Sequence, residues 1–260
     1  MSKKTNLRIG IPGWSTGENS YGAGKSYLEF ASNFGRAVIV TPEMVPEDNI
    51  VDILLLPGGP DLNPRAYGQT PGFFTGNADV FKEYFYSEML GKYIEAGIPC
   101  FGVCLGMQAL AVHFGSTLTQ NLLYHPHSKA RWEAGHEVYP LHYNHTSGEL
   151  HIQKTYGFEV NSHHHQGVYL NQLGQSLIPT NVYPEVEKMG QNTPETCVVE
   201  SFVHQDLPIV GIQWHPEEWY DSYAMKMFEL LCSYYTENAN NEGEKVPFSA
   251  FVQQGLQPVS

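Results

Sequence analysis

The chain has 260 residues, a formal net charge of −13 and an aromatic content of 13%. A chain of this length can bury a large core within one domain, and its acidity argues against nucleic acid or an anionic membrane as a partner. The sequence has no apolar run of about 18 residues, no apolar signal-peptide core and too few cysteines for a disulfide scaffold. We therefore expect a cytoplasmic protein with reduced cysteines.

Strands and helices alternate along most of the chain, which predicts a mostly parallel sheet with helices on both faces. The predicted elements are strand 7–11, helix 24–34, strands 37–40 and 51–56, helix 79–96, strand 98–103, helix 105–114, strands 197–203 and 209–214, and helix 219–236. Residues 130–161 combine turn residues with alternating stretches, and they predict antiparallel hairpins beside the main sheet. The predicted fold class is therefore α/β.

The helix predicted over 79–96 carries a regular apolar stripe. Phe81, Phe85, Met89 and Tyr93 recur at a spacing of four, and Gly97 follows where a helix commonly stops. Beyond the last predicted helix the composition becomes polar. We expect residues 1–236 to form a single catalytic domain and residues 237–260 to form a loosely held polar tail.

Cys104 lies between Gly102 and Gly106, at the junction of the predicted strand 98–103 and helix 105–114. A cysteine on such a corner sits in a tight turn beside the positive end of a helix, which favours the nucleophilic thiolate. This is the layout of a nucleophile elbow, with cysteine in place of serine. The alternative is a buried, inert cysteine at a helix start.

His215 and Glu217 close the apolar strand 209–214, with Pro216 between them. Proline biases His215 toward extended backbone, where residues i and i+2 point to the same side. Glu217 can then orient the imidazole, and the imidazole can take a proton from Cys104, which are the parts of a catalytic triad. The alternative is a strand that ends in a solvated His-Pro-Glu turn.

A third motif, Pro57-Gly58-Gly59, follows the apolar strand 51–56. Its bare backbone can aim an N–H group at a developing oxyanion, with the N–H of Leu105 as a second donor. An ordinary strand-to-loop turn would use the same residues. All three motifs follow the carboxyl ends of predicted strands, where open α/β sheets bind their ligands.

Together these motifs resemble the class I glutamine amidotransferase superfamily, which uses a Cys-His-Glu triad. Two further patterns are similar to its γ-glutamyl-γ-aminobutyrate hydrolase-like subgroup, peptidase C26. They are Pro57-Gly58-Gly59-x-Asp61-x-x-Pro64-x-x-Tyr67-Gly68 and Val160-Asn161-Ser162-x-His164-x-Gln166, the latter preceded by His136-x-Val138. The resemblance covers roughly residues 7–235. It implies a flavodoxin-like three-layer sandwich with a mostly parallel central sheet and an antiparallel hairpin extension.

The resemblance also implies roles for individual residues. Cys104 would be the nucleophile, His215 the base and Glu217 its partner. The implied substrate-binding residues are Gly58, Gly59, Leu105, Gln108, Asn161, Ser162, His163 and His164. The implied reaction is hydrolysis of the γ-glutamyl amide bond of glutamine or of a γ-glutamyl amine through a glutamyl thioester, with no cofactor.

Leu105 keeps a second interpretation open. The hydrolase subgroup often has arginine directly after the nucleophile, whereas leucine is common in domains that deliver ammonia to a partner synthetase. A catalytically silent binding module is a third alternative. The expected partners are thus a small γ-glutamyl substrate and, in the second interpretation, a synthetase; a homodimer stays open. We expect loops around Tyr21, Tyr67, 72–76 and 120–135 to select the leaving amine.

Two patterns suggest cofactors that we do not expect. Gly22-Ala23-Gly24-Lys25-Ser26 looks like the end of a phosphate-binding loop, but Asn19 stands where that motif requires its first glycine. Three histidines, 163–165, and the pair His125 and His127 suggest a metal. Because no carboxylate or cysteine at a suitable spacing completes a site, we expect no catalytic metal.

Overall fold

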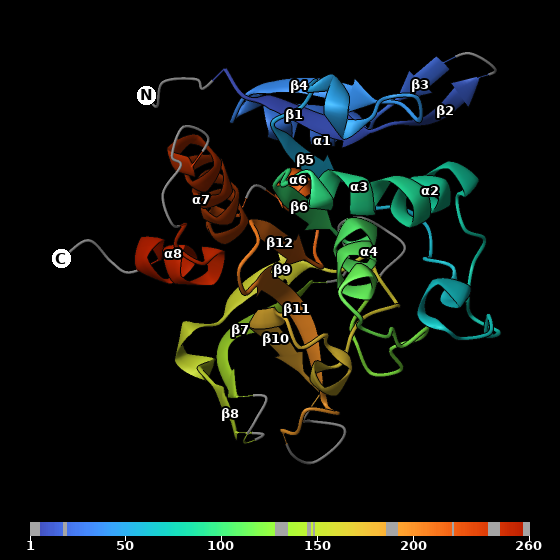
Figure 1. The fold of residues 1–260 in the computed structure, drawn as a ribbon. Helices are drawn as coiled ribbons and strands as arrows, with labels where there is room; N and C mark the ends of the chain where they lie inside the picture. The colour runs from blue at the N-terminus through green and yellow to red at the C-terminus, as the bar shows by residue number, and fades with distance from the viewer. Residues whose placement is uncertain are drawn as a thin grey trace.

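The structure is a computed structural model, and it describes residues 6–17, 20–127, 135–144, 147, 149–185, 192–219, 221–238 and 245–256. The strands of its main sheet are β1 (Arg8–Pro12), β4 (Arg36–Val40), β5 (Ile53–Leu56), β6 (Cys100–Val103), β7 (Gly135–Asn144), β8 (Glu149–Ile152), β9 (Phe158–Asn161), β10 (Leu177–Pro184), β11 (Cys197–His204) and β12 (Ile209–Ile212). Within the described residues these ten strands run in the order β4-β1-β5-β6-β12-β11-β10-β7-β8, with β9 beside β7 (Figure 1).

The sheet has a parallel half and an antiparallel half. From β4 to β12 every neighbouring pair is parallel, so these strands end at the same edge. From β12 through β11, β10 and β7 to β8 every pair is antiparallel, as is the pair of β7 with β9. The α/β fold class and the hairpin extension predicted from the sequence are therefore confirmed. The expectation for residues 128–134 lies outside the described residues.

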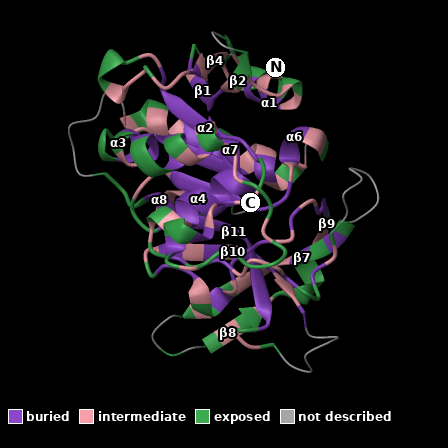
Figure 2. Ribbon diagram, turned by 90° about the vertical axis from the view of Figure 1, so that its right-hand side faces the viewer, coloured by how far each residue is buried: buried purple, intermediate pink, exposed green. Residues whose placement is uncertain are grey.

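Helices cover both faces of the sheet. They are α1 (Lys25–Ser32), α2 (Val80–Tyr84), α3 (Leu90–Glu95), α4 (Leu105–His113), α6 (Pro216–Trp219), α7 (Ser222–Asn238) and α8 (Phe248–Gly255). The side chains of β5 alternate between two cores: Ile53 and Leu55 pack with α1 and α7, whereas Leu54 and Leu56 pack with α3 and α4. Buried residues accordingly run through the centre of the molecule in Figure 2.

The helix predicted over 79–96 is present, but it is not regular. A π-helical turn, Phe85–Met89, separates α2 from α3. The extra residue per turn changes which side chains face the core, so that Tyr86 is buried in addition to Phe85 and Met89. Gly97 has a φ of 75°, which suits its predicted role as the residue that stops the helix.

Three elements differ from the sequence expectations. A small hairpin of β2 (Trp14–Gly17) and β3 (Ser20–Gly22) follows β1, and strand β10 was not predicted. The expected loose tail is wrong for its described part, because α8 buries Phe248 and Val252 against the fold. Residues 239–244 and 257–260 lie outside the described part of the chain. None of the described helices combines the length and apolarity needed to span a bilayer.

Candidate active site

Cys104 occupies a strained corner between β6 and α4. Its φ of 49° and ψ of −107° lie outside the regions that L-residues readily adopt, and Asn49 is the only other described non-glycine residue with a positive φ. Backbone strain of this kind costs about 1–3 kcal/mol and concentrates at functional sites. The backbone N–H of Cys104 donates to the carbonyl of Ile212 at 2.8 Å, which ties this corner to the end of β12.

The absence of a side chain at Gly106 lets α4 pack directly against β5. A Cβ at this position would lie 2.3 Å from the carbonyl oxygen of Leu56. The first N–H groups of α4, including that of Leu105, have no acceptor within the helix. The glycines around Cys104 therefore serve the close approach that the sequence predicted, and they aim the start of α4 at the end of β5.

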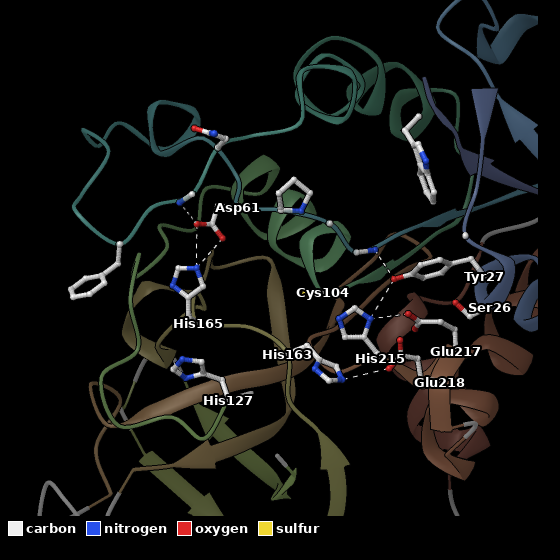
Figure 3. Close-up of a pocket in the computed structure, with 18 of the residues that line it drawn as sticks. Ser26, Tyr27, Asp61, Cys104, His127, His163, His165, His215, Glu217 and Glu218 are labelled. Carbon is white, nitrogen blue, oxygen red and sulfur yellow. Dashed lines mark hydrogen bonds and ion pairs between the residues drawn. The ribbon is translucent and has the colours of Figure 1, made fainter. Parts of the chain in front are cut away.

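His215 follows β12 and stands next to Cys104. Its Nδ1 lies 2.7 Å from Oε1 of Glu217, which leaves Nε2 available to the thiol (Figure 3). Burial opposes protonation of the ring, but the charges and hydrogen bonds of Cys104 and Glu217 outweigh it and raise the pKa of His215 well above its ordinary value. The geometry thus favours a thiolate–imidazolium pair. The sequence predicted this proximity from two separate strand ends.

Tyr27, on α1, is a contact that the sequence analysis missed. Its hydroxyl accepts a hydrogen bond from the N–H of Gly58 at 2.8 Å and lies 3.4 Å from Nδ1 of His215. Burial, reinforced by the negative charges of Glu217 and Cys104, raises its pKa well above the ordinary value. Tyr27 therefore stays a neutral hydroxyl that links the glycine loop to the histidine.

The loop that follows β5 is held by side chains at successive carbonyls. Tyr86 donates to the carbonyl of Pro57 at 2.9 Å, and the ammonium of Lys82 donates to the carbonyl of Gly58. Gly58 lies so close to the site that a Cβ there would come within 2.8 Å of the His215 ring. Because the N–H of Gly58 is already taken by Tyr27, the N–H of Gly59 is the better candidate for an oxyanion donor.

Lys82 is a second residue that the sequence analysis missed. Its side chain is buried, and its ammonium lies 5.0 Å from the centre of the Trp14 ring. Burial lowers the pKa of Lys82, against the opposing charges of Asp79 and Cys104. A lysine off the apolar stripe of an amphipathic helix is indistinguishable from a solvated residue in sequence, which hid this contact.

These residues line one cleft of about 880 Å³ at the carboxyl edge of the parallel strands. Its wall is made by Trp14, Gly24, Ser26, Tyr27, Gly58, Gly59, Pro60, Asp61, Phe74, Gly76, Asn77, Cys104, Asn121, His127, His163, His165, His215, Glu217 and Glu218. Gly24 and Ser26 lie at the start of α1, so the sequence that resembled a phosphate loop contributes to the cleft wall. Of the loops expected to select a leaving amine, 72–76 and 120–127 contribute residues, whereas Tyr21 and Tyr67 do not line it.

Four of the predicted substrate-binding side chains support the cleft instead of lining it. Asn161 accepts from the N–H of His215 at 2.8 Å and donates to its carbonyl at 2.9 Å. Gln108 donates to the carbonyl of Gln166 at 3.1 Å, and Ser162 donates to the carbonyl of Pro126 at 2.5 Å. Leu105 is buried in the core beside α3. Gly58, Gly59 and His163 do line the cleft.

The three consecutive histidines divide between two environments. His163 and His165 face the cleft, where their Nε2 atoms lie 3.4 Å from Glu218 and 3.0 Å from Asp61 (Figure 3). His164 points the other way, as alternation along extended backbone requires, and it is buried. It is thus a fifth predicted substrate-binding residue that does not line the cleft.

His164 instead groups with His125 and Glu200 in an arrangement able to hold a metal ion. Glu200 supplies the carboxylate that sequence spacing did not reveal. The ligand types that the sequence analysis found incomplete are therefore assembled by the fold, away from the cleft surface.

Comparison with known proteins agrees with this geometry. The family model for peptidase C26 matches residues 13–217, most of the chain. The glutamine amidotransferase-like protein YvdE of Lactococcus lactis is 26% identical over 80% of this chain and 87% of its own length. A candidate glutamine amidotransferase of Schizosaccharomyces pombe is 30% identical over 79% of each chain. The A chain of the glutamine-hydrolysing GMP synthase of Thermococcus kodakarensis is 30% identical over 55% of this chain and 64% of its own.

Solved structures share the fold. A candidate GMP synthase component from Thermoplasma acidophilum superposes with a TM-score of 0.57 at 20% identity, covering 91% of this chain and 99% of its own. A glutamine amidotransferase from Thermotoga maritima gives 0.52 at 16% identity, covering 97% and 91%. With the family match over residues 13–217, these likenesses show that the chain belongs to the peptidase C26 family and is a glutamine amidotransferase-like protein of hydrolase type.

Proposed function

We propose that this protein hydrolyses γ-glutamyl amide bonds through a thioester on Cys104. The observation that carries the proposal is the strained corner that places Cys104 beside the His215–Glu217 pair. A nucleophile, a base in contact with it and a carboxylate that orients the base are the parts that covalent acyl transfer requires.

In the first half-reaction, the Cys104 thiolate attacks the γ-carbonyl carbon of the substrate and a tetrahedral oxyanion forms. The protonated ring of His215 then gives its proton to the leaving nitrogen, the carbon–nitrogen bond breaks, and a glutamyl thioester remains. In the second half-reaction, His215 takes a proton from water as the water attacks the thioester. Glutamate leaves and the thiolate is restored.

The oxyanion would lie between the N–H of Gly59 and the N–H of Leu105. Tyr27 occupies the N–H of Gly58 and Lys82 holds its carbonyl, so the following peptide is fixed with its N–H on the opposite side. A preorganised donor of this kind is worth about 2.7–4 kcal/mol in the transition state.

The size of the cleft supports a substrate larger than glutamine. Its volume of about 880 Å³ is near the top of the range, roughly 300–1,000 Å³, for sites that enclose drug-sized ligands. Asp61, His165 and Phe74 form the part of the wall contributed by the loops after β5 and β9, and we assign this part to the leaving amine.

A panel of γ-glutamyl amides that includes glutamine tests the proposal through the amine released. We expect turnover by the wild type and none by Cys104→Ala, while Cys232→Ala, which changes a buried cysteine on α7, retains full activity. A glutamine-analogue alkylator should label Cys104 alone, as a mass increase on that peptide. Amine release by Cys104→Ala at the wild-type rate would contradict the mechanism.

Delivery of ammonia to a partner is the second candidate, favoured by the likeness to the glutamine-hydrolysing GMP synthase chain and by Leu105 after the nucleophile. In that case the isolated protein would hydrolyse glutamine slowly and other amides not at all. Rapid turnover of a larger γ-glutamyl amide by the isolated protein would rule it out.

A further inference from the structure

A cluster of buried ionisable side chains lies behind the cleft wall, and the proposed reaction does not use it. His125, His136, His164 and Glu200 are brought together from four segments of the chain, and their side chains are at most 2% exposed. The rings pack against one another: the centroid of His125 lies 4.5 Å from those of both His136 and His164. Burial of so many polar groups needs a partner for each.

The three rings converge on one carboxylate oxygen. The Nε2 atoms of His125, His136 and His164 lie 2.9, 3.5 and 3.7 Å from Oε1 of Glu200. Only the shortest of these contacts is a direct hydrogen bond between the side chains. Among the described residues, Oε2 of Glu200, both ring nitrogens of His136 and Nε2 of His164 have no hydrogen-bond partner. These atoms are gathered at one point and are left unsatisfied there.

The second nitrogen of His164 identifies what the first one needs. Nδ1 of His164 lies 3.0 Å from the carbonyl oxygen of Gln166, which can only accept, so Nδ1 carries a proton. In the neutral ring, Nε2 then presents a lone pair toward the carboxylate of Glu200. A cation between them would bind both. Metal-bound histidines in proteins usually donate their other N–H to a carbonyl or carboxylate in this way.

We propose that His125, His164 and Glu200 bind a divalent transition-metal ion, with His136 as the fourth ligand. The ligand atoms of a tetrahedral zinc site lie about 3.3 Å apart, because each bond is about 2.0–2.1 Å long. The three Nε2–Oε1 distances of 2.9, 3.5 and 3.7 Å bracket that value. Three imidazoles and one carboxylate suit zinc, and four protein ligands make a closed, structural site.

The site would fasten the wall of the cleft. His164 stands between His163 and His165, which face the cleft, and Asn161 in the same segment grips the backbone of His215. Glu200 lies on β11 and His136 on β7, while His125 belongs to the loop that carries His127 into the cleft. One ion would therefore fix both cleft loops to the sheet without contacting the substrate.

Metal content tests the proposal directly. Untagged full-length protein, purified without chelator, should contain one zinc ion per chain by inductively coupled plasma mass spectrometry. Protein unfolded with chelator and refolded with Co²⁺ alone should bind one equivalent and show the strong visible absorption of tetrahedral cobalt. We expect Glu200→Gln and His164→Asn to weaken Co²⁺ binding by more than about 100-fold.

The chain offers a matched control in the exposed pair Glu149 and His151, whose Oε1 and Nε2 atoms lie 3.3 Å apart. Glu149→Gln and His151→Asn should leave metal content unchanged. Circular dichroism verifies that each variant folds, and if Glu200→Gln does not, His164→Asn and the wild-type cobalt spectrum decide. Substoichiometric metal in the wild type, with no cobalt absorption after refolding, would overturn the site in favour of a hydrogen-bonded cluster. Unchanged affinity in both ligand variants would also overturn it.

Discussion

The parallel and antiparallel halves of the sheet contribute to the cleft in different ways. The parallel half supplies the reacting groups: the glycine loop after β5, Cys104 after β6 and His215 after β12. The antiparallel half supplies supports, including Asn161 at the end of β9 and Glu200 within β11. Parallel strands bring their carboxyl ends to one edge, so three loops meet there, whereas antiparallel strands alternate their ends and must reach the cleft sideways.

This difference separates chemistry from positioning. A residue of the parallel half should affect the chemical step directly, and a residue of the antiparallel half should act through the placement of another group. Substitutions in the two halves should therefore give different kinetic signatures. Variants of Glu217, Asn161, Lys82 and Cys104 test that division.

The largest effect is expected at Glu217, beside the end of β12. Glu217→Gln keeps the shape but removes the charge that orients His215, and we expect kcat to fall by about 10³–10⁴-fold. The pKa of His215 should also fall, because Glu217 helps to raise it. An NMR titration of the His215 ring measures this shift. An unchanged pKa together with wild-type turnover would remove Glu217 from the mechanism.

The same pair sets a dependence of stability on pH. The pKa of folded His215 lies above its unfolded value of about 6.5, so the pair stabilises the fold fully below that pH. The contribution is lost as the pH rises through the folded pKa. We therefore expect the difference in unfolding free energy between wild type and Glu217→Gln to shrink from about pH 6 to about pH 10, as measured by urea denaturation.

Asn161 tests the antiparallel half. Asn161→Ala removes two hydrogen bonds to the backbone of His215, and we expect kcat to fall by about 10–100-fold with little change in KM. The unfolding free energy should fall by about 1–3 kcal/mol. Asn171→Ala, at an exposed position, is the control. If KM rose while kcat held, Asn161 would contact substrate, as the sequence resemblance implied.

The same division explains what the sequence could predict. Cys104, His215 and Gly59 each follow a recognisable apolar strand, and parallel topology brings such strand ends together. The fold class and the proximity of these groups were therefore accessible. Asn161 and His164 occupy a recognisable motif, but which face of the extended chain turns toward the cleft depends on pairing between β7 and β9.

Other contacts depend on distances along the chain that no local pattern records. Glu200 lies 75 residues from His125, and it resembles any polar position in a strand until β11 is placed inside the sheet. Lys82 is hidden for a related reason. The π-helical turn that follows α2 changes which side chains face inward, and regular periodicity does not anticipate that extra residue.

Lys82 should have a smaller effect than Asn161, because it acts on a carbonyl of the parallel half without touching the reacting atoms. Lys82→Met keeps the apolar stem but loses the bond to Gly58, and we expect about a tenfold fall in kcat. Since burial lowers the pKa of Lys82, removing its charge should not destabilise the fold. Lys92→Met, at an exposed site on α3, is the control. Unchanged turnover of Lys82→Met would mean that Gly59 needs no such support.

The smallest effect concerns the strain at Cys104 itself. In most settings glycine is less stable than alanine by about 0.5–1 kcal/mol, but at a φ of 49° the order should reverse. We expect Cys104→Gly to be more stable than Cys104→Ala by about 1 kcal/mol in urea denaturation, while both variants are inactive. Gly91→Ala, on α3, gives the ordinary order for comparison, with alanine the more stable. If Cys104→Ala were the more stable of the pair, the corner would store no strain, and the parallel half would hold its nucleophile by packing alone.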